Sequence, residues 1–138
     1  MIRLELFDVP PSLNEWTRMH WSKQRKQKQA WLWEVISTAL NAKVGKPRYK
    51  QATIKITYYF TQQRRRDTDN YTPKFLMDSL VHVGIIQDDR ADWVKVSWDF
   101  ATGPKRKTTI EVWEGFDEQT GPDDRDTRSN SGGLAPKL

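Results

Sequence analysis

The chain has 138 residues, which fits one domain with a single modest hydrophobic core. It has no cysteine, no apolar run long enough to span a membrane and no secretory signal, which excludes disulfides and thiolate metal sites and predicts a cytosolic protein without membrane contact. The net charge is +5, and because residues 115–138 carry −2, the first 114 carry +7, which attracts polyanions but also fits a merely soluble surface.

The N-terminal part of the chain is predicted to form a strand, a loop and a long helix. Residues 2–8 alternate apolar and polar side chains, which predicts a half-buried strand ended by two prolines. Residues 11–14 are expected to form a loop with side chains able to bond backbone or phosphate. Ser22 can cap a helix that runs to about Val44, where glycine and proline end it.

The predicted helix has two different halves. Its second half carries a wide apolar face that includes Trp31, Val35 and Ala39. Its first turns are basic although the helix macrodipole disfavours cations there, which suggests either phosphate binding or a solvated lysine-rich face. The loop residues Trp16 and Trp21 could stack on bases, but we interpret both as residues at the edge of the core.

The C-terminal half is predicted to contain a strand, a helix and a hairpin. Residues 52–60 are rich in β-branched and aromatic side chains and form the surest strand. Residues 74–83 have helical apolar spacing between Pro73 and Gly84. Residues 93–113 indicate two strands joined by a basic turn, and so a hairpin.

The order β-α-β-α-β-β predicts a single α+β domain over residues 1–114, with a mostly antiparallel sheet covered by two helices. Residues 115–138 are polar and poor in apolar side chains, which predicts a disordered tail.

A segment of dense charge follows the 52–60 strand. Arg64, Arg65 and Arg66 run directly into Asp67 and Asp69. Arginines bind phosphate oxygens, and two carboxylates that leave an extended backbone on one face suit a divalent cation. A third carboxylate usually completes such a site, and a chain that doubles back after the next helix could return Asp88 or Asp89 to it.

Blander interpretations of these residues stay open. Asp67 and Asp69 could serve only in a turn, or Asp69 or Asn70 could cap a helix. Lys74 could stabilise charge on a phosphate, or it could be a solvated helix lysine. A D-x-D pair alone is weakly specific.

Four motifs in order resemble the RusA family of Holliday-junction resolvases. They are Pro10-Pro11-Ser12-Leu13-Asn14, Arg65-Arg66-Asp67-Thr68-Asp69-Asn70, Lys74 with Asp78, and Gly84-Ile85-Ile86-Gln87-Asp88-Asp89. The resemblance covers about residues 2–114. It implies a cytoplasmic, bacterial or phage-encoded homodimer that uses Mg²⁺ or Mn²⁺ to cut four-way DNA junctions by symmetric paired nicks, in recombination and repair.

The resemblance also implies roles for individual residues. Asp67, Asp69 and Asp89 match the essential acids of the family and Lys74 its essential lysine, with Asp88 as a neighbouring candidate ligand. The residues expected to contact DNA are Asn14, Lys23, Arg25, Lys26, Lys28, Arg64, Arg65, Arg66, Lys105, Arg106 and Lys107. Two alternatives remain: a non-catalytic branched-DNA-binding accessory protein on the same scaffold, and a nuclease for another branched nucleic acid.

Overall fold

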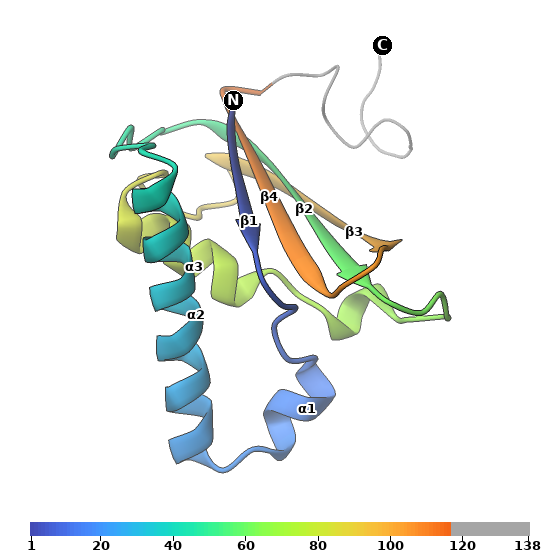
Figure 1. The fold of residues 1–138 in the computed structure, drawn as a ribbon. Helices are drawn as coiled ribbons and strands as arrows, with labels where there is room; N and C mark the ends of the chain where they lie inside the picture. Colours follow the sequence, from blue (N-terminus) through green and yellow to red (C-terminus); the bar gives the residue numbers. More distant parts are fainter. Residues whose placement is uncertain (117–138) are drawn as a thin grey trace.

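In the computed structural model, which describes residues 1–116, four strands form one sheet and helices pack against one of its faces (Figure 1). The elements in chain order are β1 (Ile2–Leu6), α1 (Leu13–Arg18), α2 (Trp21–Asn41), β2 (Ala52–Phe60), the 3-10 helix η1 (Thr68–Asn70), α3 (Lys74–Val83), β3 (Val94–Thr102) and β4 (Lys107–Glu114). The α+β class is confirmed. All but the first two residues of the predicted disordered tail, 115–138, lie outside the described residues.

The strand order is β1-β4-β2-β3. β4 pairs antiparallel with both β1 and β2, whereas β2 pairs parallel with β3, from Ala52 opposite Val94 to Phe60 opposite Thr102. On β2 the even-numbered side chains, such as Ile54, Ile56 and Tyr58, are buried beneath the helices. The sheet is therefore mostly antiparallel, as predicted, with one parallel pair.

The predicted hairpin over residues 93–113 is wrong. β3 and β4 are not neighbours, because β2 lies between them and hydrogen-bonds to both. β2 and β3 are parallel and so need a crossover, which α3 supplies. The short link after β3 crosses the end of β2, where the Gly103 N–H donates to the Phe60 carbonyl at 2.9 Å.

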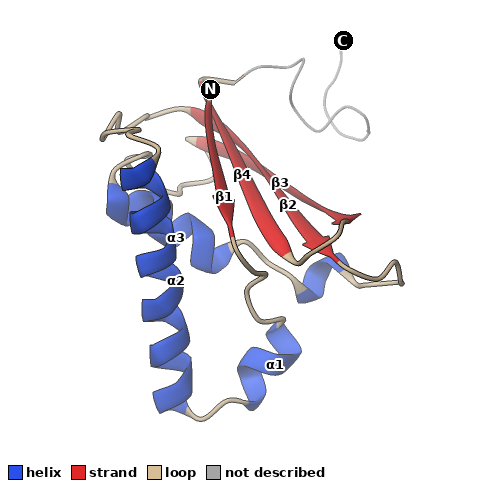
Figure 2. Cartoon of the chain, in the orientation of Figure 1, coloured by secondary structure: helices blue, strands red, loops and turns tan. Residues whose placement is uncertain are grey.

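The structure describes three α-helices in residues 1–116 where two were predicted (Figure 2). The extra helix, α1, takes up part of the expected loop at residues 11–14. Ser12 caps it: its hydroxyl accepts from the Glu15 N–H at 3.2 Å, and the Glu15 carboxylate accepts from the Ser12 N–H at 2.9 Å. This reciprocal capping box is a sequence signature of a helix start.

The other helices begin and end close to their predicted positions. α2 begins at Trp21 with His20 as its cap, rather than with Ser22, and it buries Trp31, Val35 and Ala39 as predicted. α3 has the predicted bounds, and Gly84 ends it with a left-handed φ of 86° that disfavours other residues. None of the helices in residues 1–116 has the length and apolar character needed to cross a membrane.

Candidate metal and nucleic-acid site

Residues 67–70, here named the first acidic segment, form η1 and the residue before it. The Asp67 carboxylate accepts from the Asp69 N–H at 3.0 Å and so caps η1. Neither Asp69 nor Asn70 caps α3, which begins after Pro73 without a side-chain cap. The tight turn replaces the extended backbone that was expected between the two aspartates. Both side chains are exposed, and that of Asp69 makes no hydrogen bond to another residue of 1–116.

Two side chains from the sheet anchor the first acidic segment and the two residues that follow it. The Trp98 indole N–H donates to the Thr68 carbonyl at 3.1 Å, and the Tyr58 hydroxyl donates to the Thr72 carbonyl at 3.3 Å. The Tyr71 ring packs edge-on against Phe60 and Phe100, with ring centroids 5.5 Å apart in both pairs. These contacts hold the backbone here without using the carboxylate of either Asp67 or Asp69.

A contact between distant parts of the chain joins two of the sequence motifs. The Asn14 N–H donates to the Asn70 side-chain oxygen at 3.0 Å, across 56 residues of sequence. Nearby, Trp16 of α1 packs edge-on against Phe75 of α3, with centroids 4.6 Å apart. The proline-serine-asparagine motif and the first acidic segment therefore form one surface.

Asp88 and Asp89, here named the second acidic segment, lie on the connection between α3 and β3. Backbone bonds fix this connection: Tyr49 pairs with Ile86, and the Trp93 carbonyl accepts from the Ala52 N–H at 3.1 Å, at the N-terminal end of β2. The Asp88 carboxylate accepts from the Asp89 N–H at 2.7 Å.

The two acidic segments do not come together within one chain. They flank α3, whose ten residues span about 15 Å at the usual helical rise, and Figure 1 shows η1 and the chain after α3 at opposite ends of that helix. Within residues 1–116 no group of three histidine, aspartate or glutamate side chains is arranged to hold a metal ion. The chain after α3 therefore does not return Asp88 or Asp89 to Asp67 and Asp69, contrary to the sequence prediction.

Lys74 begins α3, four residues after Asn70. Its ammonium lies 3.5 Å from the Asp78 carboxylate, one helical turn away, and both side chains are exposed. Such an exposed pair contributes only about 0.3–0.5 kcal/mol, so it does not prevent Lys74 from turning to a phosphate.

The arginine run at residues 64–66 and the basic turn at residues 105–107 meet around Phe60. The Arg66 guanidinium lies 3.7 Å from the centre of the Phe60 ring, and that of Arg106 lies 5.5 Å from it. Arg64 and Arg65 are exposed and make no ion pair with another residue of 1–116.

The turn at residues 105–107 is partly neutralised. Arg106 pairs with Asp8 at 2.9 Å, and Lys107 pairs with Glu5 at 2.8 Å. The hydrogen bond from Lys107 lowers the pKa of the Glu5 carboxyl below its ordinary value, although burial opposes this shift. Lys105 instead lies 5.7 Å over the ring of Phe7. Arg64 and Arg65 are therefore more available to phosphate than the 105–107 turn.

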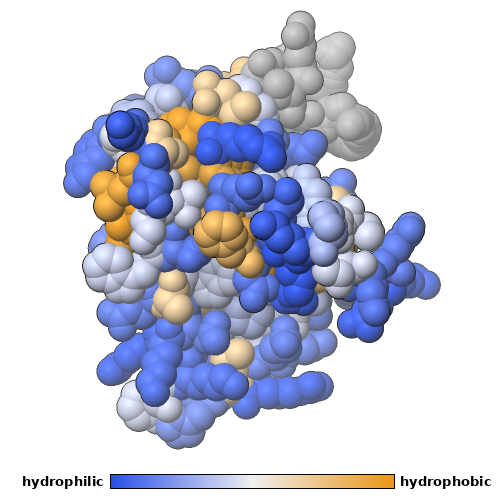
Figure 3. All heavy atoms as spheres, viewed as in Figure 1, coloured by the Kyte–Doolittle hydropathy of each residue, from blue (hydrophilic) through white to orange (hydrophobic). Residues whose placement is uncertain are grey.

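The start of α2 is exposed and basic. Lys23, Arg25, Lys26 and Lys28 all face solvent, and the first turn holds no acid. Trp21 is 64% exposed beneath the Arg25 guanidinium, at 5.4 Å, so its interpretation as a core-edge residue is wrong, whereas half-buried Trp16 fits it. In Figure 3 the part of the surface over α1 and the first turns of α2 is almost wholly hydrophilic.

Sequence reasoning missed the anchoring roles of Trp98 and Tyr58. A half-buried indole N–H usually needs a hydrogen-bond partner, and for Trp98 that was the available signal. The partner, 30 residues away, was not predictable from spacing.

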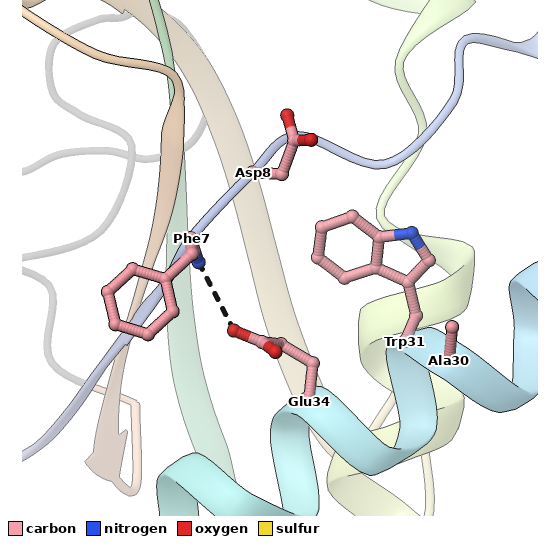
Figure 4. Close-up of a pocket in the computed structure, with 5 residues that line it drawn as sticks. All are labelled: Phe7, Asp8, Ala30, Trp31 and Glu34. Atoms are coloured by element: carbon pink, nitrogen blue, oxygen red, sulfur yellow. Dashed lines mark hydrogen bonds between the residues drawn. The ribbon is translucent and has the colours of Figure 1, made fainter.

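A hollow between the end of β1 and α2 is a weaker candidate site (Figure 4). Its two acids already have partners, because Glu34 accepts from the Phe7 N–H at 3.2 Å and Asp8 pairs with Arg106. Its lining residues are Phe7, Asp8, Ala30, Trp31 and Glu34.

Comparison of the chain with known protein families found no match, and comparison with curated proteins found none either. Any function therefore rests on the motifs and on the geometry described above.

Proposed function

We propose that the chain is a divalent-metal-dependent endonuclease that cuts branched DNA, four-way junctions in particular, as a homodimer. The observation that carries this proposal is the bond between Asn14 and Asn70, which places two RusA-like motifs on one surface beside the exposed pair Asp67 and Asp69. The resemblance to the RusA family supplies the substrate class.

Asp67 and Asp69 are the residues that would hold the metal ion. Oxygen donors of this kind fit Mg²⁺ or Mn²⁺, and the anchors from Trp98 and Tyr58 keep the segment in place. When bound, such an ion polarises the phosphate and acidifies an attacking water. Asp67 stays ordered by capping η1, while Asp69 keeps both carboxylate oxygens free of side-chain partners in residues 1–116.

The cations near this segment would position the DNA backbone. Arg64 and Arg65 are free to bind phosphates on either side of the cut, and Arg66 is held against Phe60. Lys74 would stabilise charge that develops on the scissile phosphate. The basic start of α2 extends the phosphate-binding surface away from the metal site.

A third carboxylate would have to come from a second chain. Asp89 follows the far end of α3 from Asp67 and Asp69, and within residues 1–116 no three acidic or histidine side chains gather to hold a metal. A two-fold dimer would supply it and would also present two sites to a two-fold junction.

The test compares cleavage of labelled four-way junction, flap and duplex DNA at equal salt, with Mg²⁺ or with EDTA. We expect Mg²⁺-dependent cleavage of the junction, abolished by Asp69→Asn and retained by the control Asp92→Asn, an exposed acid paired with Arg90 at 3.1 Å. Junction binding without cleavage, unaffected by Asp69→Asn, would favour the non-catalytic DNA-binding alternative.

Lys74→Ala separates catalysis from binding. We expect this variant to bind the junction as the parent chain does while losing most cleavage. An equal loss of both would make Lys74 a phosphate anchor instead.

A further inference from the structure

The outer edge of β3 has no strand partner within residues 1–116. β3 is the outermost strand of the sheet, and within residues 1–116 no strand pairs with its outer edge (Figure 1). The Trp93 carbonyl and the Gly103 N–H both bond to β2, so odd-numbered residues turn their backbone groups inward. The even-numbered residues from 94 to 102 therefore turn theirs to the outer edge. Two of these N–H groups are already used, because that of Val94 donates to the Arg90 carbonyl at 3.0 Å and that of Phe100 to the Asp99 carboxylate at 2.8 Å. The backbone groups of Val96 and Trp98, on either side of Ser97, remain as a template for another strand.

The side chains of β3 have a self-complementary order. Lys95 and Asp99 stand two residues to either side of Ser97, near the middle of the strand, on the sheet face away from the helices. Both are exposed, and neither forms an ion pair with another residue of 1–116. Lys95 lies 4.8 Å over the Phe116 ring, which does not neutralise its charge.

We propose that β3 pairs antiparallel with β3 of a second copy of this chain, about a two-fold axis that passes through Ser97. In this register Lys95 stands opposite the partner's Asp99, and the reverse pair forms by symmetry. Shifting the axis by one residue in either direction places neither charge opposite the other. The two sheets join into one, and the strand pairing supplies backbone hydrogen bonds.

The backbone geometry favours this register. The even-numbered residues, whose groups face the edge, become the hydrogen-bonded pairs, such as Val96 with the partner's Trp98. The odd-numbered residues become the non-hydrogen-bonded pairs, in which opposite Cα atoms lie about 4.5 Å apart and side chains are closest. The two ion pairs therefore fall where cross-strand contact is strongest.

The apolar side chains of β3 also favour a second copy of the chain as the partner. Val96, Trp98 and Phe100 face the helices but are only half-buried, although the central strand buries its equivalent side chains. A second copy covers them with the same residues, as an isologous interface requires.

The opposite edge of the sheet, β1, is already neutralised. β1 has five residues against the nine of β3, and its charges are used within the chain: Arg3 pairs with Glu111 at 3.2 Å and Glu5 with Lys107 at 2.8 Å. Its edge therefore lacks the unpaired charges that select a second copy at β3.

A cysteine at the axis tests the register directly. The chain has no cysteine, and Cα atoms about 4.5 Å apart are within disulfide range. We expect oxidised Ser97→Cys to run as a covalent dimer on non-reducing gels, and the matched variant Ser37→Cys, exposed on α2, to stay monomeric. No crosslink at position 97, or equal crosslinking of both variants, overturns the proposal.

Charge reversal gives an independent measurement, by sedimentation velocity at low salt. We expect the native chain to be a dimer, Lys95→Asp and Asp99→Lys each to weaken association at least about tenfold, and an equal mixture of the two variants to pair again. A monomeric native chain, or single reversals without effect, overturns the interface. The proposal takes its partner from the homodimer proposed above, but these readouts need no nuclease activity, so either proposal can fail while the other stands.

Discussion

The two acidic segments are held in different ways, at opposite ends of α3. The first is fixed by side chains that reach across to it, from Trp98 and Tyr58, and it adjoins Asn14. The second lies on a connection fixed by backbone pairing with Tyr49, beyond the far end of α3. The motif that contains Asn14 therefore contacts the first segment, and it makes no such contact with the second.

The largest expected effect on cleavage comes from two single variants, one that removes an acid of the first segment and one that removes an acid of the second. We expect Asp69→Asn and Asp89→Asn each to lower cleavage about 100-fold or more. A mixed dimer of the two variants keeps one intact site, built from Asp67 and Asp69 of one chain and Asp89 of the other. Equal mixing should therefore restore about a quarter of the sites, seen as single nicks and not as paired ones.

The unmixed variants at the same total concentration are the control for that experiment. A mixture as inactive as its components would mean that both segments act within one chain. The two segments, which lie at opposite ends of α3, would then have to approach each other in the active state.

The next largest effect is a loss of DNA affinity when Trp21, at the start of α2, is replaced. Trp21 is exposed amid basic residues, and Trp33 is 59% exposed on the same helix, farther from its basic start. We expect Trp21→Ala to weaken binding of junctions with unpaired bases about tenfold, because an aromatic face stacks on a base. Titration at one fixed salt concentration measures this. Trp33→Ala should leave the affinity unchanged, and equal losses would contradict a specific role for Trp21.

A smaller effect should come from the indole that anchors the first segment. Trp98→Phe leaves the Thr68 carbonyl without its donor, which costs about 1 kcal/mol and loosens η1. We expect cleavage to fall about fivefold with unchanged junction affinity. The matched variant Trp93→Phe alters a half-buried tryptophan near the second segment. If both variants lowered cleavage alike, the loss would reflect general destabilisation.

The smallest effect is a dependence of stability on pH. Burial raises the pKa of the Tyr58 phenol above its ordinary value of 10.0. The stability gained by keeping this phenol neutral is present in full below pH 10 and is lost as the pH rises above it. Denaturant unfolding at neutral and at alkaline pH should show this loss in the native chain and a smaller one in Tyr58→Phe. Identical alkaline losses would exclude Tyr58 as the source.

The elements that the sequence predicted well are those with a strong local pattern. The alternation of residues 52–60 and the proline and glycine around residues 74–83 gave the bounds of β2 and α3. α1 was missed although Ser12 and Glu15 have the spacing of a capping box. The hairpin prediction failed because no local pattern shows that β2 inserts between β3 and β4.

The candidate site was predictable in part for the same reason. Asp67, Asp69 and the arginines lie in one short segment, so the sequence could mark them. The return of Asp89 depended on the direction of the chain after α3, which follows from the parallel pairing of β2 with β3. The contact of Asn14 with Asn70 joins segments whose proximity only the folded chain shows.

The most direct test of the central claim is a crystal of the full chain soaked in Mn²⁺, with the metal located by anomalous scattering. We expect a peak within about 2.2 Å of carboxylate oxygens of both Asp67 and Asp69, with an oxygen of Asp89 from a second copy completing the shell. A site elsewhere, or no peak at this pair when the ion is bound in solution, would contradict the account.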